Sequence, residues 1–214
     1  MRHWRAQRHA LIAGIALFVG FAVAAPREAL GQTPPAVAQD LRLATSGTYT
    51  LDGSHTGVNW RVSHMGLSAF AGRFDRTSGQ LRFDAADPVR SSLEVSIEAG
   101  SLSTPVDQLT AELRGVQWFN IAAHPAITFR STQVERLGEA RGRVTGDLTM
   151  NGMTMPVTLD VTWRGVAENP FSRAKTLGFS VRGQIRRSEF GIAALVPMIG
   201  DDVDIEIEAE FALR

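Results

Sequence analysis

The sequence predicts an all-β fold made from one antiparallel sheet, and three observations lead to this prediction. Short apolar runs alternate with polar residues along residues 49–214, which is the period of strands with one buried face. Two of these runs flank an Asn-Gly dipeptide, the usual signal of a two-residue hairpin turn. One helix-like segment, residues 104–125, interrupts the runs. A sheet with one apolar face must cover that face, either as a sandwich or as a closed barrel.

The Asn151-Gly152 turn predicts the register of the strands on either side of it. If these two residues form the turn, Arg143 lies opposite Asp160, and every apolar residue of the two runs falls on one face. The other face then holds threonine pairs and one pair of opposite charges, which are favourable across a ladder. A single register satisfies both faces.

The other alternating runs predict further strands of the same sheet. They fall at residues 58–63, 81–84, 93–98, 127–130, 179–182 and 203–211. Turn residues separate the runs, and no composition change marks a boundary between them. We therefore predict one domain over residues 48–214.

Residues 104–125 predict one short helix followed by an apolar segment. Pro105 can open a helix, apolar residues recur at spacings of four and three as far as Val116, and Gly115 can end the helix. The residues that follow include a Trp-Phe pair, which is too apolar for a free loop. We expect this segment to pack across one end of the sheet, and an end plug fits a closed barrel better than a sandwich.

The N-terminal residues predict export. Three arginines precede an uncharged run at residues 10–25, and Ala22-Val23-Ala24 offers a small-x-small cleavage site, so residues 1–24 are predicted to be a signal peptide. The run has 16 residues, fewer than the roughly 20 that span a bilayer, which makes an uncleaved anchor the less favoured alternative. Residues 25–47 are rich in Pro, Ala and Gln without a sustained period, and we predict a disordered leader.

Composition excludes several classes of function. The chain has no cysteine, so disulfides, thiol chemistry, thiolate metal sites and a lipid-modified N-terminal cysteine are ruled out. The whole chain has 22 basic and 22 acidic residues, and removal of the three signal-peptide arginines leaves 19 against 22, a charge of about −3 with no basic block. A nucleic-acid partner is not expected, and the mature protein should be free in the periplasm.

The polar residues offer little chemistry. His55, His64 and His124 form no metal-binding spacing. His55 and His64 are nine residues apart and would point to opposite faces of one strand, so we interpret both as structural or solvated histidines. Ser54 is adjacent to His55, but adjacency alone does not make a nucleophile and base, and no triad is visible. We therefore predict no catalytic residue and no metal site.

Two charged pairs have open alternatives. Asp201-Asp202 could hold a cation, but beside Gly200 we interpret them as ordinary turn residues. Arg186-Arg187 could contact an anionic head group at a rim, but we interpret them as a solvated face.

Four blocks of residues resemble a known family. They are Tyr49, Leu51, Asp52, Ser54, His55, Val58, Trp60, Val62, His64, Gly66, Gly72 and Phe74; Leu113, Phe119, Pro125, Ile127, Phe129 and Ser131; Val144, Gly146, Leu148, Thr149, Gly152, Thr154, Pro156, Val157 and Leu159; and Arg187, Ser188, Phe190, Gly191, Ile192, Gly200, Asp201, Val203 and Glu210. In this order they resemble the YceI-like periplasmic lipid-binding proteins. The resemblance implies a lipocalin-like antiparallel barrel of about eight strands, without catalytic residues, whose lumen holds a polyisoprenoid or another long amphiphile.

The apolar face of the predicted strands is the candidate lining of that lumen. Its residues are Trp60, Val62, Phe74, Phe83, Val95, Ile97, Phe129, Leu148, Met150, Met153, Met155, Leu159, Val161, Phe179, Val181, Ile205 and Ile207. The expected partner is an isoprenoid lipid of the polyprenyl phosphate or quinone type, with no other cofactor and with transient membrane contact for loading. Met150, Met153 and Met155 near the turn suggest a portal, since methionine adapts to irregular apolar partners; fixed core is the alternative.

Two other functions stay open at this point. One is a haem-binding or catalytic barrel that uses His55 or His64. The other is a structural module whose core is filled by side chains, because a ring of eight strands is just wide enough either to fill or to hold one ligand.

Overall fold

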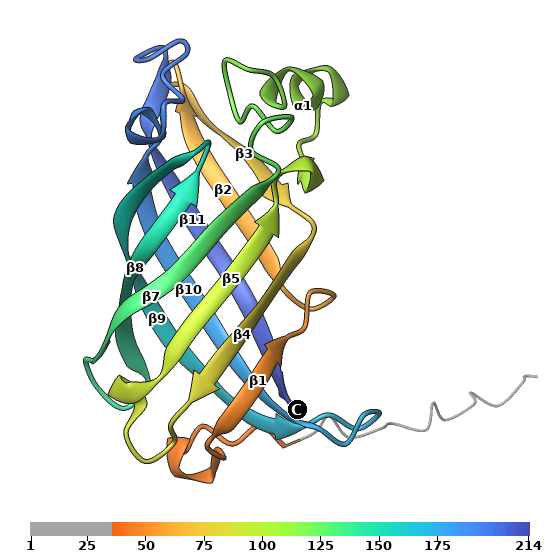
Figure 1. The fold of residues 1–214 in the computed structure, drawn as a ribbon, viewed down its shortest axis with the longest axis vertical. Coiled ribbons are helices and arrows are strands. Elements are labelled where there is room, and N and C mark those ends of the chain that lie inside the picture. Colours follow the sequence, from red (N-terminus) through yellow and green to blue (C-terminus); the bar gives the residue numbers. More distant parts are fainter. Residues whose placement is uncertain (1–35) are drawn as a thin grey trace, which may run out of the picture. The chain divides into compact units, whose positions relative to one another are not determined.

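The computed structural model describes residues 36–214 of the chain (Figure 1). The predicted signal peptide and the first part of the predicted leader lie outside these residues. No helix in the described part is long and apolar enough to cross a membrane. Its strands are β1 (Gly47–Leu51), β2 (Gly57–His64), β3 (Ser68–Phe74), β4 (Thr77–Phe83), β5 (Ser92–Glu98), β6 (Leu102–Ser103), β7 (Ala126–Arg136), β8 (Arg141–Met150), β9 (Met153–Glu168), β10 (Lys175–Arg186) and β11 (Ile199–Leu213). Its helices are α1 (Asp107–Leu113) and the 3-10 helices η1 (Leu41–Leu43), η2 (Pro88–Arg90), η3 (Ala99–Ser101) and η4 (Arg187–Phe190).

The sheet closes into a ring. Its strands follow the order β1, β4, β5, β7, β8, β9, β10 and β11, and β11 pairs back onto β1. Every pairing in this ring is antiparallel. Closure removes the exposed strand edges of an open sheet. The predicted antiparallel barrel of about eight strands is confirmed, and the sandwich alternative is not what the chain forms.

Two positions of the ring are each occupied by two strands placed end to end. β11 pairs with β2 through residues 199–208 and with β1 through residues 211–213. In the same way, β3 pairs with β2 while β4 pairs with β1. The loop of residues 52–56 lies at the junction of β1 and β2, where the backbone N–H of Asp52 still donates to the carbonyl oxygen of Glu210 at 2.8 Å.

The β8–β9 hairpin has the predicted register. Arg143 faces Asp160, and the pairs continue without a shift to the turn. Asn151 and Gly152 have φ values of +50° and +76°, the left-handed conformation that a type I′ turn requires and that Asn and Gly adopt most readily. The turn chemistry therefore fixes which residues of β8 and β9 point into the barrel.

The outer face of this hairpin carries the predicted polar pairs. The hydroxyl oxygens of Thr145 and Thr158 lie 2.9 Å apart, and Arg143 Nε donates to Asp160 Oδ1 at 3.2 Å. Both pairs are solvent-exposed, so each contributes only about 0.2–1 kcal/mol. They keep the outer face wet while the inner face stays apolar.

An aromatic cluster lies on the inner face of β4, β9, β10 and β11, toward the barrel end that is away from α1 (Figure 1). The rings of Phe83 and Trp163 stack with centroids 6.1 Å apart, and Phe179 meets Trp163 edge-on at 5.3 Å. Phe211 continues this aromatic cluster, at 6.0 Å from Phe179. Tyr49 is fully buried beside it. These packed side chains therefore narrow this end of the barrel, where Leu41 and Gly138 also line the cavity.

The chain just before β1 is ordered against the same end, which differs from the prediction of a disordered leader as far as residue 47. Ala38 forms a β-bridge with Val166, and the Trp163 indole N–H donates to the carbonyl oxygen of Gln39 at 2.8 Å. Residues Leu41–Leu43 form a turn of 3-10 helix. The prediction is wrong for residues 38–46, because a tertiary contact with a distant tryptophan orders a segment that has no strand or helix period of its own.

The segment after β6 forms the predicted end plug at the opposite end (Figure 1). α1 ends at Leu113, close to the predicted end, and both Leu113 and Trp118 are buried. The ring of Phe119 meets that of Phe74 edge-on at 5.5 Å. Val116 instead is 77% exposed, since the helix stops before it and its expected place on the apolar face does not exist.

The register can be tested by a disulfide, because the chain has no cysteine of its own. Thr145→Cys with Thr158→Cys joins directly facing residues, whose Cα atoms in an antiparallel pair are roughly 4.5–5.5 Å apart, within disulfide range. We expect rapid oxidation with loss of both free thiols, measured by alkylation and mass spectrometry.

The matched control is Thr145→Cys with Asp160→Cys, a diagonal pair of the same face at roughly 7–8 Å, which should stay reduced. Cross-linking of the control pair instead of the facing pair would show a register slip of two residues.

Candidate functional site

The barrel encloses a cavity of about 670 Å³. Leu109 and Leu195 line it at the α1 end, and Ser92 and Gly138 line it near the other end. Between them the wall is mostly aliphatic and aromatic. The volume lies in the range of roughly 300–1,000 Å³ that is usual for small-molecule sites. The lumen is therefore hollow, which removes the main premise of a structural module with a filled core.

The structure places the predicted lumen residues on this wall with two exceptions. Met153 and Met155 are absent from the cavity lining. Met153 is 39% exposed at the hairpin tip, beside Gly191, and Met155 packs against the core cluster. Met150 is buried and does line the cavity. The three methionines thus do not form one portal. Near the β8–β9 turn, Met153 lies at the surface, Met155 packs in the core and Met150 lines the cavity.

Glycines on the inner face were missed as site residues by sequence reasoning. A Cβ added at Gly72 would lie 2.2 Å from the Trp60 ring, and one at Gly183 would lie 2.4 Å from Leu159 Cδ2. Each of these large side chains therefore lies against the neighbouring strand of the sheet, in space that a glycine leaves free. Because these large side chains lie over glycines, they leave the centre of the barrel open. The signal was present in the sequence as glycines at apolar-face positions of alternating runs.

Two polar atoms in the cavity wall have no hydrogen-bond partner in the described part of the protein. They are the indole nitrogen of Trp60 and the hydroxyl oxygen of Thr77, both fully buried. A buried polar group without a partner costs about 1–3 kcal/mol. Because neither atom has appreciable accessible surface, both lie within the packed wall and are not open to the lumen.

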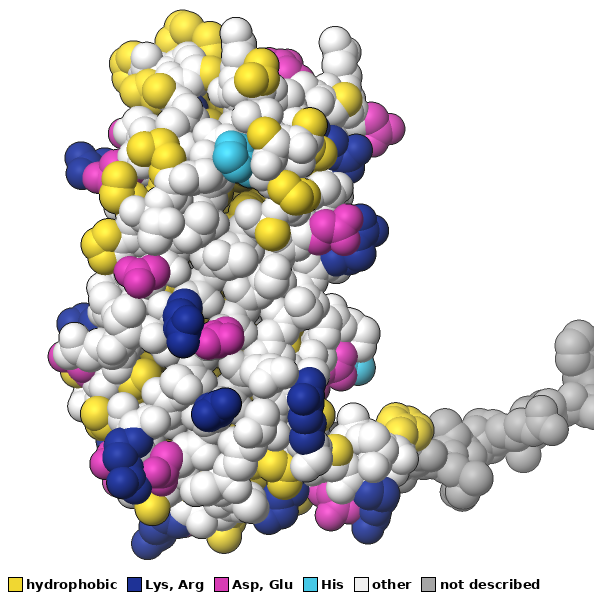
Figure 2. All heavy atoms as spheres, in the orientation of Figure 1, with side chains coloured by type: hydrophobic (Ala, Val, Ile, Leu, Met, Phe, Trp, Pro, Cys, Tyr) yellow, Lys and Arg dark blue, Asp and Glu magenta, His cyan; other side chains and the backbone are white. Residues whose placement is uncertain are grey.

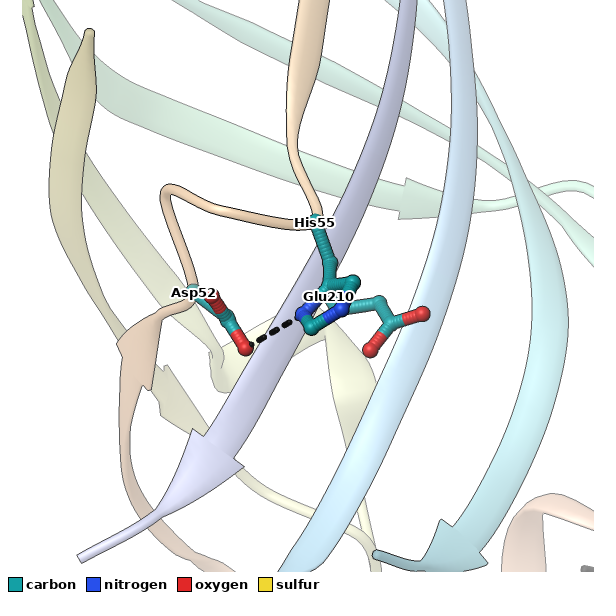
Figure 3. A group of neighbouring side chains, drawn as sticks. All are labelled: Asp52, His55 and Glu210. Carbon is teal, nitrogen blue, oxygen red and sulfur yellow. Dashed lines mark hydrogen bonds and ion pairs between the residues drawn. The ribbon is translucent and has the colours of Figure 1, made fainter.

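His55 and His64 lie on different sides of the barrel wall, but His55 is in the loop between β1 and β2, so the spacing argument for a single strand does not apply to it. His64 is half-buried and lines the cavity. His55 lies on the outer surface beside Asp52 and Glu210 (Figure 3), where the three side chains bring possible ligand atoms within 4.8 Å of one another. All three residues are at least partly exposed. A lumen ligand cannot use His55.

Ser54, His55 and Asp52 touch, but not in the geometry of a catalytic triad. His55 Nδ1 lies 2.8 Å from Asp52 Oδ2 and 3.3 Å from Ser54 Oγ, so one nitrogen faces both partners. A relay needs the base to meet the nucleophile with one ring nitrogen and the carboxylate with the other. Ser54 Oγ also donates to Asp52 Oδ1 at 2.5 Å. The group is a hydrogen-bonded turn in which Asp52 organises the loop between β1 and β2.

These contacts shift the pKa of both ionisable groups in the loop. Hydrogen bonds from Ser54 and His55 lower the pKa of Asp52 to about 2. The hydrogen bond and the charge of Asp52, with a smaller effect of Glu210, raise the pKa of His55 above 6.5.

Arg187 is a second position where the structure differs from the sequence-based interpretation. Arg186 is exposed and pairs with Glu189, as expected for a solvated face. Arg187 is only 5% exposed and lines the cavity, so that interpretation is wrong for it. β10 ends between the two residues and η4 begins, which turns the second arginine inward.

Asp201 is likewise not in a turn but in β11. Its carboxylate accepts hydrogen bonds from the backbone N–H of Ser188 at 2.9 Å and from Ser188 Oγ at 2.7 Å. These bonds lower the pKa of Asp201. The residue therefore anchors η4 to the barrel wall, and no cation is needed to explain it.

The ring of antiparallel strands and its apolar cavity define a hollow β-barrel of the lipocalin-like type. The particular family follows from the sequence: the YceI-like domain profile matches residues 49–211. The chain belongs to the YceI-like family.

Relatives of known sequence agree with this assignment. A UPF0312 protein of an Enterobacter strain is 35% identical over 169 residues, which cover 78% of this chain and 87% of that protein. Protein YceI of Escherichia coli is 34% identical over the same length and the same shares of the two chains. Both relatives are bacterial.

Solved structures share the barrel. BcnA of Burkholderia cenocepacia is similar with a TM-score of 0.66 and 26% identity, covering 75% of this chain and 98% of that one. The YCEI protein of Campylobacter jejuni gives 0.64 and 28% identity, with 71% and 90% covered. A polyisoprenoid binding domain of Saccharophagus degradans, implicated in plant cell wall breakdown, gives 0.57 over 79% of this chain and all of that domain. At 18% identity this last likeness extends to the fold alone.

The loop on the outer face yields a pH prediction. In an NMR titration of the folded protein, His55 should titrate above pH 6.5, and Asp52→Asn should bring its pKa back toward 6.5. Because the pKa of His55 is raised, its stabilising contact with Asp52 is fully present below pH 6.5 and is lost as pH rises through the raised value. Because the pKa of Asp52 is lowered, the same contact is lost on the acid side as pH falls from 3.8 through about 2. A wild-type His55 that titrates at or below pH 6.5 contradicts the contact.

Proposed function

We propose that this protein is a non-enzymatic periplasmic carrier or sequestering protein, which holds one long isoprenoid lipid of the polyprenyl phosphate or quinone type in the barrel lumen. The apolar cavity of about 670 Å³ carries the proposal. The likeness to a domain named for polyisoprenoid binding agrees with it. In this proposal, the seventeen residues predicted from the alternating runs contact the lipid, apart from Met153 and Met155.

Tight binding of such a ligand requires few specific polar contacts. Each buried CH₂ contributes about 0.8 kcal/mol, so a five-carbon isoprene unit contributes roughly 3–4 kcal/mol. Nanomolar affinity corresponds to about 12 kcal/mol, which several units supply after the cost of association. The mostly aliphatic and aromatic wall of the cavity is therefore sufficient for an isoprenoid tail.

Haem binding is the weaker alternative. His64 is the histidine that lines the cavity, while His55 faces solvent. A haem would need the site to supply its axial ligand from His64 and to neutralise its propionates. A Soret band that disappears in His64→Ala would favour this alternative over a lipid.

Membrane contact for loading is part of the proposal. Apolar side chains are exposed at the α1 end, over the β2–β3 turn and the loop before β11 (Figure 2). They include Met65, Leu67, Leu195 and Met198. The Met65 N–H donates to the Met198 carbonyl oxygen at 2.7 Å, which joins the two segments, and Leu195 also lines the cavity. Because Leu195 belongs both to this apolar surface and to the cavity lining, a lipid tail that enters beside it avoids water.

The periplasmic location rests on the predicted signal peptide of residues 1–24. Cleavage at the predicted site gives an exported protein that starts at Ala25 or within a few residues of it. Free diffusion in the periplasm also agrees with the absence of cysteine for lipid attachment.

The direct experiment is native mass spectrometry of the full chain, exported from a bacterial host and purified under mild extraction. We expect a bound mass that corresponds to an isoprenoid lipid and that leaves on denaturation. Protein that emerges without bound lipid and takes up no isoprenoid from vesicles is incompatible with the proposed function.

A lumen-filling variant tests where the lipid lies. Val181 points into the cavity and Arg182, its neighbour in β10, points outward. Val181→Trp should reduce lipid retention at least about tenfold, because the indole occupies space that the tail needs. The melting temperature should change little, since the indole enters a void rather than a filled core.

Arg182→Trp is the matched control, with the same side chain placed on the outer face. It should retain lipid as the wild type does. Equal retention in both variants would place the ligand outside the barrel.

A further inference from the structure

Arg187 is a buried cation in the wall of the cavity. It is 5% exposed and stands at the start of η4, where β10 leaves the barrel wall. It lines the same cavity as Trp118, and its guanidinium carbon lies 5.6 Å from the centroid of the Trp118 ring. Burial lowers the pKa of Arg187, but a guanidinium is so basic that it stays charged near neutral pH. The other ionisable residues of the lining, among them Glu112, Glu135 and Arg143, are exposed or half-buried, so within residues 36–214 Arg187 is the one charged residue of the wall that is buried.

Three backbone carbonyl oxygens accept hydrogen bonds from this guanidinium. Nε donates to Gly200, Nη1 to Ile192 and Nη2 to Ile199, each at 2.8 Å. These bonds hold the loop of residues 191–198 and the start of β11 against η4. A guanidinium has five N–H groups in a fixed fork, so two of them are not used by these bonds.

The charge itself is not balanced nearby. Within residues 36–214, no carboxylate oxygen lies within 4.0 Å of the Arg187 guanidinium. Asp201 acts on it from farther away and is engaged by Ser188. A buried ion without a paired charge is costly, and carbonyl dipoles together with one aromatic face offset only part of that cost. The three bonds to the loop use the fork of N–H donors, which no neutral side chain offers, but they supply no negative charge to balance the guanidinium.

We propose that Arg187 anchors the anionic head group of the lumen ligand, so that the cargo is an isoprenoid acid with its tail in the barrel and its phosphate or carboxylate at the guanidinium. This inference rests on the proposed function and narrows its ligand class from any long amphiphile to an anionic one. A phosphate or carboxylate matches the fork of N–H donors and supplies the missing negative charge. Burial among apolar side chains strengthens the pairing, since the local dielectric is low. A neutral quinone would leave the charge unbalanced.

The test compares three ligands with one tail: geranylgeraniol, geranylgeranyl phosphate and geranylgeranoic acid. Affinities for the lipid-stripped full chain are measured by competition with an apolar fluorophore. We expect the wild type to bind at least one of the two acids about tenfold or more tightly than the alcohol, since hydrogen bonds to charged groups are the stronger ones. The ratio between the two acids tells whether the site takes a phosphate or a carboxylate.

Substitutions then assign the preference to one residue. Arg187→Met should bring the ratio of acid to alcohol affinity close to one, and Arg187→Lys should restore part of it. Arg186→Met, which removes the exposed neighbouring charge, should leave the ratio unchanged. Because acid and alcohol affinities are compared within the same variant, a general loss of lipid affinity does not change their ratio.

A second measurement uses the wild-type protein and therefore does not depend on whether the Arg187 variants fold. In the wild-type protein, the preferred acid should shift the Arg187 Nε–H resonance in ¹⁵N NMR, and the alcohol should not. Equal affinity for acids and alcohol overturns the head-group anchor and leaves the lipid-binding function standing. A preference for acids without a shift at Arg187 also overturns it. If none of the three ligands binds, the proposed function fails first, and the anchor fails with it.

Discussion

Closure of the sheet by β11 is the constraint on which the rest of this protein depends. β11 pairs with β10 through residues 202–212, and its other edge pairs with β1 and β2. Because the ring is closed, the two-residue alternation of every strand acquires an inside and an outside. Apolar side chains then face one another across a lumen instead of facing water. The inward glycines opposite Trp60 and Leu159 stop these side chains from filling that lumen.

The features that could be predicted from sequence are those with local causes. Asn151 and Gly152 adopt the backbone conformation of their turn without help from the rest of the chain, and the turn then assigns Leu148 and Leu159 to the inner face. The same alternation placed Trp60 and Ile205 on the cavity wall. Periodicity therefore predicted most of the lining, although it could not show whether the lumen was hollow, which depends on the fit of side chains from strands far apart.

The features that were missed depend on contacts between distant residues. Arg186 and Arg187 are identical in type and adjacent, and only the end of β10 separates their environments. Residues before β1 are ordered by Trp163, which lies more than a hundred positions away in the chain. Met153 continues the apolar alternation, but it lies at the tip of the hairpin, where the barrel wall has ended. No local pattern carries such information.

The distribution of tryptophan has a practical consequence. Of the four tryptophans, Trp4 falls in the predicted signal peptide, and Trp60, Trp118 and Trp163 all line the cavity. Without the predicted signal peptide, the emission excited at wavelengths that Tyr49 does not absorb would come entirely from indoles in the lumen wall. A quinone accepts electrons from an excited indole and should quench that emission. A prenyl lipid whose head group accepts no electrons should only shift the emission maximum. The barrel thereby reports the presence and the kind of its cargo without any added label.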